Sequence, residues 1–371
     1  MSSGVPRGIG PLPRRIGDPY NGGLQGGVAV EAMEGGEAPR ILVTGSRGKS
    51  SLVRLLCAGL EARGLEPWGR ITGVLPRQIG PGGPRAIRRT APAHVEEMRW
   101  WLGQVPSGAS VVLENSAVAP DLQPLAARWL VPCLVVWTNA RPDHPEAWDP
   151  GEEGAARALA AGVPEGCPVA AGREALPWVR RLLPRSPLRE ARPEEPLSGE
   201  APFGAENRGL ALAALEGLGL DGASARRGMV ALPPDVADYR VLPLGAARLA
   251  SAFAANEPES TERLFEATGW TPEETTLLYH HRPDRPGRLA AFLPWIARRP
   301  WGEVVFSRDR SFWGRFAPRR GPGGLGTWRD LTGGEDLARW VETRGRVFGC
   351  GNVAGSPLEL LRTRREGGQG A

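Results

Sequence analysis

Lysine is nearly absent from this chain of 371 residues. The 46 basic residues include one lysine, Lys49, and all the others are arginine. An ammonium group is a compact point charge on a flexible stem, whereas the guanidinium of arginine is a planar fork. Lys49 lies between Gly48 and Ser50, where a phosphate-binding loop needs such a point charge. The one lysine of the chain therefore marks a candidate phosphate site.

Cysteine is also scarce, and long apolar runs are missing. The four cysteines are scattered, without a CxxC pair or histidines at metal-finger spacing, so we expect free thiols in a reducing cytoplasm. No stretch approaches the roughly 18 to 20 apolar residues that a membrane span needs. The N-terminal residues hold no short apolar run with a small-residue cleavage site, so we expect no secretory signal.

The positive charge of the chain is not concentrated in any segment. The net charge is +5 and the pI is about 9.5, values that could indicate a nucleic-acid partner. The arginines, however, are spread among 41 acidic residues, without a dense basic block or an aromatic-interleaved stripe. We therefore expect no nucleic-acid binding.

The distribution of glycine, proline and apolar residues predicts a tail and two domains. Residues 1–38 are rich in Gly, Pro and Arg without periodicity, and we expect them to be disordered. Pro233-Pro234 marks a break further along the chain. We therefore expect a first domain at 39–234 and a smaller second domain at 235–371.

Strands are expected to alternate with helices in both domains. The first should have strands at 40–44, 109–114 and 133–138, helices near 94–104, 120–129, 206–219 and 222–231, and a surface loop at about 184–204. The second should have strands at 239–243, 247–254, 275–280, 303–306 and 346–350, with helices at 259–267, 286–297, 334–342 and from 355. This alternation predicts mostly parallel sheets with right-handed crossovers, so the fold class is α/β.

A glycine-rich loop follows the first strand and precedes an amphipathic helix. Its residues are Gly45, Ser46, Arg47, Gly48, Lys49, Ser50 and Ser51. The common phosphate-loop pattern has a glycine where this chain has Val43, but the physical logic is unchanged. Glycines let backbone N–H groups and the helix N-terminus face phosphates, Lys49 reaches the β- and γ-phosphates, and Ser50 binds Mg²⁺. The alternative is an ordinary strand-to-helix turn.

Two later strands end in polar residues that are candidates for the same site. Glu114 ends the strand at 109–114, and Asn139, Asp143 and His144 follow the strand at 133–138. The carboxyl ends of parallel strands form the binding edge of an open sheet. Glu114 and His144 converging on Lys49 would suit a second Mg²⁺, although histidine is an unusual magnesium ligand. A surface carboxylate and a structural histidine are the alternatives.

The combination of GSRGKS, a strand-end glutamate and TN-x-x-x-DH resembles the Mur ligase superfamily. The match is closer to the ligase subunit of poly-γ-glutamate synthases (the PgsB/CapB type) and covers nearly everything from residue 40 onward. The matching segments are VTGSRGKSSLVRLL at 43–56, ITGVLPRQI at 71–79, LENSAVAPDLQ at 113–123, TNARPDH at 138–144, FGAENRGLALA at 203–213, PPDVADYRVLPL at 233–244, SAFAANEPEST at 251–261, RPDRPGR at 282–288 and FGCGNVAG at 348–355.

The resemblance implies a fold and a set of residue roles. It implies a phosphate-loop ATPase domain with a mostly parallel sheet, followed by a smaller Rossmann-like domain. Lys49 with the loop 45–51 would hold the ATP phosphates, Ser50 the first Mg²⁺, and Glu114 with His144 the second. The remaining implied nucleotide contacts are Asn139, Asn207, Asn256, Arg282, Asp284 and Arg285.

The resemblance also implies an activity and partners. Enzymes of this superfamily phosphorylate a carboxylate with ATP and let an amine attack the acyl phosphate. Glutamate or poly-γ-glutamate is the implied substrate, and a small integral-membrane subunit is the implied partner. We therefore expect a cytoplasmic enzyme that is held at the inner face of the cell membrane by association.

Two segments depart from the family pattern. Where the poly-γ-glutamate ligases usually carry a GKTTG-type segment, this chain has Gly69-Arg70-Ile71-Thr72-Gly73, and a PNIxEQ-like stretch reads Ala91-Pro92-Ala93-His94-Val95-Glu96-Glu97. Several Mur ligases also use a carbamylated lysine near the metal ions, and this chain has no second lysine for that role. Two alternatives therefore stay open: a ligase for another acidic or amino substrate, and a phosphate-loop ATPase that energises a membrane export complex.

Overall fold

The computed structural model describes residues 38–89, 93–144, 147–197, 200–255, 257–310 and 320–367. The tail predicted to be disordered, residues 1–38, lies almost wholly outside the described residues, as does Asn256. No helix in the described part of the chain is long and apolar enough to cross a membrane.

The first domain is built on a sheet of eight strands in the order β4-β3-β2-β5-β1-β6-β7-β8. From β2 to β8 neighbouring strands run parallel, whereas β2, β3 and β4 pair antiparallel at one edge. The strands are β1 (Arg40–Thr44), β2 (Pro67–Ile71), β3 (Arg77–Ile79), β4 (Arg85–Ala86), β5 (Ser110–Glu114), β6 (Leu134–Trp137), β7 (Val169–Ala171) and β8 (Leu188–Glu190).

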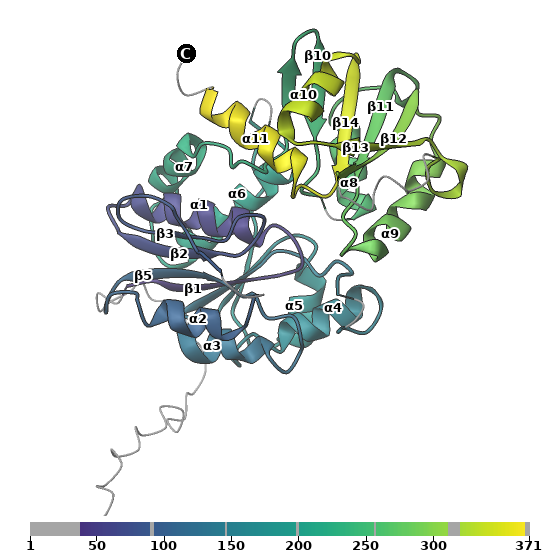
Figure 1. The fold of residues 1–371 in the computed structure, drawn as a ribbon. Coiled ribbons are helices and arrows are strands. Elements are labelled where there is room, and N and C mark those ends of the chain that lie inside the picture. Colours follow the sequence, from purple (N-terminus) through teal and green to yellow (C-terminus); the bar gives the residue numbers. More distant parts are fainter. Residues whose placement is uncertain are drawn as a thin grey trace, which may run out of the picture.

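Helices cover both faces of this sheet (Figure 1). One face packs against α1 (Lys49–Glu61), α6 (Pro202–Gly217) and α7 (Gly222–Ala231). The other packs against α2 (Glu96–Leu102), α3 (Gln123–Leu130), α4 (Gly151–Ala160) and α5 (Leu176–Leu182). Because both faces are covered, the middle residues of β1 and β5 and all of β6 are apolar without polar alternation, as in parallel strands generally.

The second domain has a smaller sheet of six strands in the order β13-β12-β11-β14-β10-β9, in which β9 alone is antiparallel to its neighbour. Its strands are β9 (Val241–Leu244), β10 (Ala247–Ser251), β11 (Thr275–His280), β12 (Glu303–Asp309), β13 (Thr327–Leu331) and β14 (Arg346–Gly351). One face packs against α8 (Pro258–Glu266) and α9 (Pro286–Ala297), and the other against α10 (Gly334–Glu342) and α11 (Ser356–Gly367).

Most expected elements are present, and the α/β class with two mostly parallel sheets is confirmed. The loop prediction for 184–204 is wrong at both ends, because β8 lies inside this range and α6 begins at Pro202. The strands β2, β3, β4, β7 and β13 and the helices α4 and α5 have no counterpart among the sequence-based predictions.

The segment that connects the domains is tied to the first one. This segment runs from the end of α7 to the start of β9 and includes the predicted boundary at 234/235. Arg54 of α1 donates to Asp238 at 3.0 Å, and Arg77 of β3 forms an ion pair with Asp235. These charge pairs fix the point at which the chain enters the second domain.

Candidate functional site

The loop between β1 and α1 has a backbone that requires glycine. Gly45 has a φ of 129° and Gly48 a φ of 80°, and the left-handed region favours glycine. A Cβ atom on Gly45 would lie 2.0 Å from the Thr138 Oγ1, which leaves no room for a side chain. No side chain caps the N-terminus of α1 within the described residues. The loop therefore ends in a helix N-terminus of the kind that binds anions.

Lys49 is partly buried at the first position of α1. Its Nζ donates to the Gly45 carbonyl at 2.6 Å, across the mouth of the loop. Burial lowers the pKa of Lys49, an effect that the negative charges of Glu114 and Asp143 oppose. The single ammonium group of the chain is thus desolvated inside a glycine-rich loop, where a point charge interacts strongly with an anion.

Glu114 lies beside the loop because β5 and β1 are neighbours in the sheet. The register pairs Val43 with Glu114, and the side chain of Glu114 is buried. Its carboxylate accepts a hydrogen bond from the Ser50 Oγ at 2.9 Å and another from the Thr72 Oγ1 at 2.8 Å. Three oxygen-bearing side chains therefore meet here, and oxygen is the ligand type that magnesium prefers.

His144 belongs to a second group of charges around Arg47. The Arg47 guanidinium donates to the Asp143 carboxylate at 2.5 Å, and the His144 Nε2 lies 3.6 Å from the same carboxylate. Burial opposes ionisation of Asp143, but the charge of Arg47 and then that of His144 keep the pKa of Asp143 below its usual value. The His144 ring also packs edge-on against the Trp148 ring, and the centroids of the two rings are 5.2 Å apart.

The oxygen cluster and His144 give different support to the two predicted metal ions. Ser50 and Glu114 are in contact, which fits the first predicted Mg²⁺ site. The described residues contain no group of three or more His, Cys, Asp or Glu side chains arranged to hold a metal ion. A second ion at Glu114 and His144 therefore stays a prediction.

Two of the predicted asparagines flank the loop. The Asn139 Oδ1 accepts a hydrogen bond from the Arg47 backbone N–H at 3.0 Å, and the Asn139 carbonyl accepts one from the Ser46 N–H at 3.2 Å. Asn207 of α6 lies on the other side, where its Oδ1 would be 3.2 Å from a Cβ atom on Gly48. The third asparagine, Asn256, lies outside the described residues.

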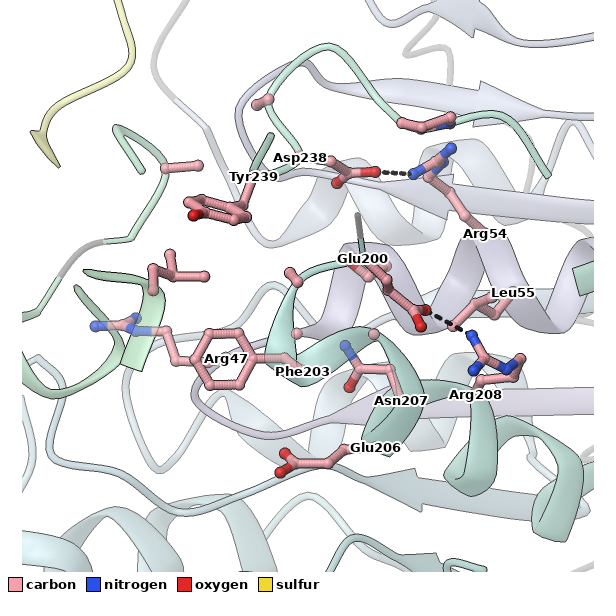
Figure 2. A pocket seen from close by; sticks show the side chains of 18 of the residues that line it. Arg47, Arg54, Leu55, Glu200, Phe203, Glu206, Asn207, Arg208, Asp238 and Tyr239 are labelled. Carbon is pink, nitrogen blue, oxygen red and sulfur yellow. Dashed lines mark hydrogen bonds and ion pairs between the residues drawn. The ribbon is translucent and has the colours of Figure 1, made fainter. Parts of the chain in front are cut away.

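A cavity of about 480 Å³ opens from this loop toward the second domain. The first domain lines it with residues of α1 and α6, and the second domain with Tyr239 and residues from β10 to α8. Figure 2 shows the side chains of Phe203, Asn207 and Tyr239 around the same space, with Arg47 nearby. Aromatic rings with a few polar groups, next to a phosphate loop, form a site of suitable size for a nucleotide.

The predicted residues of the second domain lie at the carboxyl end of β11. Arg282 donates to both carboxylate oxygens of Asp284, at 3.0 and 2.6 Å, and Arg285 is the N-cap residue of α9. Burial lowers the pKa of Arg288 in the next turn, and the positive charges of Arg285 and Arg47 lower it further. The influence of Arg47 shows that Arg288 lies within electrostatic range of the phosphate loop, whereas Arg282, Asp284 and Arg285 are not among the residues that line the cavity.

The two segments that depart from the family pattern are in contact. Arg70, buried at the end of β2, donates to the Glu97 carboxylate at 2.9 Å. Arg89 donates to the same carboxylate at 2.8 Å. Glu97 is therefore held between two guanidinium groups, close enough to Glu114 for that charge to act on Arg70.

Sequence reasoning missed two site residues. Thr72 was inside a segment noted only for its departure from the family, yet it binds Glu114 through its backbone N–H at 3.0 Å as well as through its hydroxyl. Arg141 was one of the three positions of TN-x-x-x-DH to which no role was assigned, yet its side chain is buried among acidic partners. Its position inside a motif whose other members approach the loop was the one available signal.

Comparison with known protein families and sequences gives consistent matches. Residues 241–367 match the family model described as the poly-gamma-glutamate synthase CapB C-terminal domain. The chain is 25% identical over 351 residues to the capsule biosynthesis protein CapB of Bacillus anthracis, covering 87% of this chain and 75% of that protein. It is 27% identical over 282 residues to the PGA synthase CapB of Bacillus subtilis strain 168, covering 69% and 72%.

Solved structures match the fold at lower sequence identity. A bifunctional folylpolyglutamate synthase/dihydrofolate synthase from Yersinia pestis, complexed with AMPPNP and a Mn ion, gives a TM-score of 0.59 at 17% identity, over 88% of this chain and 89% of that one. MurF from Acinetobacter baumannii gives 0.58 at 12% identity, over 89% and 76%. The predicted Mur ligase fold is confirmed, and the similarity to CapB proteins extends over most of the chain.

Proposed function

We propose that this protein is an ATP-dependent ligase that joins a carboxylate to an amine through an acyl phosphate, with glutamate or poly-γ-glutamate as its substrate. The observation that carries the proposal is the phosphate loop, in which the partly buried Lys49 ammonium lies close to the Ser50–Glu114–Thr72 oxygen cluster. Similarity to proteins named CapB and PGA synthase supports the choice of substrate.

The loop residues have separate roles in this proposal. The backbone of residues 45–51 and the Lys49 ammonium would hold the phosphates of ATP. Ser50, Glu114 and Thr72 would hold Mg²⁺, because their oxygens already converge. A bound magnesium ion would neutralise charge on the phosphate oxygens. Glu114 with His144 would hold a second ion.

The cavity would bind the nucleoside. Asn139, Asn207 and Asn256 would surround the nucleotide, and the aromatic rings of Phe203 and Tyr239 offer apolar surface for a base. Arg282, Asp284 and Arg285 would approach the phosphates from the second domain. The two domains would thus enclose one ATP molecule between them.

The reaction has two steps that balance in atoms and charge. A carboxylate oxygen of the substrate attacks the γ-phosphorus, and ADP leaves. The nitrogen of a neutral amine then attacks the carbonyl carbon of the acyl phosphate, phosphate leaves, and the amine loses a proton. Positive charge fixed at the phosphate loop stabilises the first step, and contact between the domains excludes water from the acyl phosphate.

One observation favours a second candidate, the same ligation with another acidic or amino substrate. The Arg70–Glu97–Arg89 group joins both segments that depart from the family pattern, and it lies beside Glu114. The departures from the family pattern at Arg70 and Glu97 therefore alter the charge next to Glu114 and the proposed metal site. The substrate would then differ while the use of ATP stays the same.

A screen of amino acids and dicarboxylates for ADP release, with mass analysis of the products, tests the proposal. Glutamate should stimulate ADP release and yield a γ-linked product. A different stimulating acid would support the second candidate. ATP hydrolysis that no amino or dicarboxylic acid changes would contradict ligation and support an ATPase that acts on a protein partner.

The proposed location depends on the family resemblance. We expect the protein in the cytoplasm, at the inner face of the cell membrane, in association with a small integral-membrane subunit. Fractionation of cells that express both proteins would test this. Recovery of the chain in the membrane fraction only when that subunit is present is the expected result.

A further inference from the structure

The side chain of Arg141 connects the two domains at one buried point. Arg141 follows β6 and is 5% exposed. Within the first domain, its Nε and Nη2 donate to the two carboxylate oxygens of Glu174, at 2.8 and 2.6 Å. Its Nη1 donates to the Ser260 Oγ at 2.6 Å and to Glu257 at 3.2 Å, both at the N-terminus of α8 in the second domain. One guanidinium group is therefore shared by both domains.

The backbone of Arg141 is attached to the phosphate loop. Its carbonyl oxygen accepts a hydrogen bond from the Ser46 hydroxyl at 2.7 Å. Two residues earlier, Asn139 binds the backbone N–H groups of Ser46 and Arg47. A short and continuous chain of hydrogen bonds thus runs from α8, through Arg141, to the loop that carries Lys49.

The contact between Arg141 and α8 can form and break without leaving the charge of Arg141 or of Glu257 without a hydrogen-bond partner. If the domains separate, Arg141 retains its two hydrogen bonds to Glu174. Glu257 likewise retains those from the Ser260 backbone N–H, at 2.9 and 3.0 Å, which cap α8. A buried charge that loses every partner is strongly unfavourable, but here both sides keep one. This arrangement suits a contact that is made on closure and released afterwards.

We propose that Arg141 is a positioning residue that couples closure of the second domain to the geometry of the phosphate loop. The inference rests on the proposed ligase function. Contact with Glu257 and Ser260 holds Arg141 in place, and the Arg141 carbonyl then fixes Ser46 at the start of the loop. Closure of the second domain and positioning of the ATP phosphates are therefore coupled. The loop is fully formed only when the second domain shields it from water.

A direct role in nucleotide binding is the rival explanation, because Arg141 also lines the cavity. Glu257 separates the two explanations, since it is not among the residues that line the cavity. If Arg141 acts through closure, Glu257→Gln should reproduce much of the effect of an Arg141 substitution. If Arg141 instead contacts the nucleotide, the substitution of Glu257 should have no effect on catalysis.

Arg263 provides a matched control at the same interface. It lies on α8, donates to Glu206 at 2.6 Å, and lies over the Phe203 ring at 4.4 Å from its centroid. Its Nη1 also lies 3.7 Å from the Glu174 Oε1, the oxygen to which Arg141 donates, but within the described residues none of its ion pairs or ring contacts involves the phosphate loop. Arg263→Gln therefore weakens contact between the domains but leaves in place the hydrogen bonds from Arg141 to Glu174, Glu257 and Ser260, and the bond from Ser46 to the Arg141 carbonyl.

The test compares wild type with Arg141→Gln, Arg141→Lys, Glu257→Gln, the Arg141→Gln/Glu257→Gln double variant and Arg263→Gln. Steady-state kinetics give kcat and KM, equilibrium titration gives the affinity for AMPPNP with Mg²⁺, and small-angle X-ray scattering gives the radius of gyration with and without AMPPNP. The scattering measurement does not require ligase activity. A wild type that compacts without ligating would therefore contradict the proposed function but not the coupling.

The expected result is a loss of kcat without an equal loss of nucleotide affinity. Arg141→Gln should lower kcat by about 100-fold, because small misplacements of a reacting group cost this much, with AMPPNP affinity within about threefold. Glu257→Gln should lower kcat in the same direction, and the double variant should be no worse than Arg141→Gln alone. Each should abolish compaction with AMPPNP, whereas Arg263→Gln should leave both kcat and compaction close to wild type.

Two results would overturn the inference. One is an Arg141→Gln variant that loses AMPPNP affinity as steeply as kcat while Glu257→Gln behaves as wild type, which would make Arg141 a nucleotide ligand. The other is an Arg263→Gln variant with the same loss of kcat and of compaction as Arg141→Gln. That result would mean that any weakened contact between the domains has this effect, whether or not it connects to Ser46. If Arg141→Gln does not fold, Arg141→Lys and Glu257→Gln decide the matter alone.

Discussion

The carboxyl edges of the two sheets carry polar side chains of different character. At the first edge, the partly buried Lys49 lies near the buried Glu114 and near Asp143, so several charged groups are fixed close together. At the second edge, His280 is fully buried with its Nδ1 3.1 Å from the Ser307 Oγ. Burial lowers the pKa of His280 to about 4, although the charge of Asp309 opposes this shift, so this group is neutral at pH 7.

This difference indicates that the two domains contribute differently to the proposed site. Transfer of a phosphoryl group needs positive charge that is already in place, and such charge is costly to bury unless it is compensated. The first domain meets this need with neighbouring opposite charges. At the edge of the second domain the buried His280 is neutral and the charged groups, among them Asp309 and Arg282, are exposed, which would suit a domain that closes over a charged site.

Replacement of Lys49 by arginine should have the largest effect. In Lys49→Arg a planar guanidinium replaces the compact point charge beside the Gly45 carbonyl, so we expect ADP release to fall by about 1000-fold. The control is Arg157→Lys, which places a new ammonium on the exposed surface of α4 and should change nothing. A Lys49→Arg enzyme with wild-type activity would show that the site does not depend on a point charge.

Loss of Glu97 should destabilise the first domain. Glu97→Ala leaves the Arg70 guanidinium, 1% exposed, without its carboxylate partner, so the free energy of unfolding should fall by about 3 kcal/mol. Urea denaturation measures this. Glu153→Ala, which removes exposed ion pairs to Arg157 and Arg181, should leave the midpoint unchanged. Equal midpoints for Glu97→Ala and wild type would mean that Arg70 is not held as described.

His280 should make the second domain sensitive to acid. The unfolded chain binds a proton at His280 below about pH 6.5, whereas the folded chain does so only near pH 4. Stability should therefore fall as the pH drops through this window, by about 2 kcal/mol between pH 7 and pH 5. His280→Gln should remove that part of the slope, whereas His94→Gln, at an exposed residue, should not. Identical slopes for wild type and His280→Gln would refute a neutral buried histidine.

The smallest effect is expected for the magnesium requirement. Glu114→Gln keeps the shape of the side chain but removes its charge, so half-maximal activity should need about tenfold more Mg²⁺. The comparison is Asp121→Asn, at an exposed residue of the same domain. An unchanged magnesium dependence in Glu114→Gln would place the ion elsewhere.

The sequence was sufficient for the elements with a regular pattern. The helices at 222–231, 286–297 and 334–342 and the strand at 275–280 have the predicted bounds. Lys49, Ser50 and Glu114 also come together as expected, since parallel strands bring their carboxyl ends to one edge.

The remaining parts depend on contacts between distant segments. Strands β3, β4 and β8 are two or three residues long and lack periodicity, so only their neighbours in the sheet define them. The start of α6 at Pro202 had a local signal, proline in the first turn, that the prediction of a loop overlooked. Arg141 looks like any other arginine in the sequence, because its partner Glu257 is 116 residues away.

Oxygen transfer is the most direct test of the central claim, that a carboxylate is phosphorylated before the amide forms. Glutamate labelled with ¹⁸O in its carboxylates is incubated with the enzyme, ATP and Mg²⁺, and the released phosphate is analysed by mass spectrometry. The account predicts one ¹⁸O atom in each phosphate that accompanies an amide bond. Phosphate that carries oxygen only from ATP and water would contradict it.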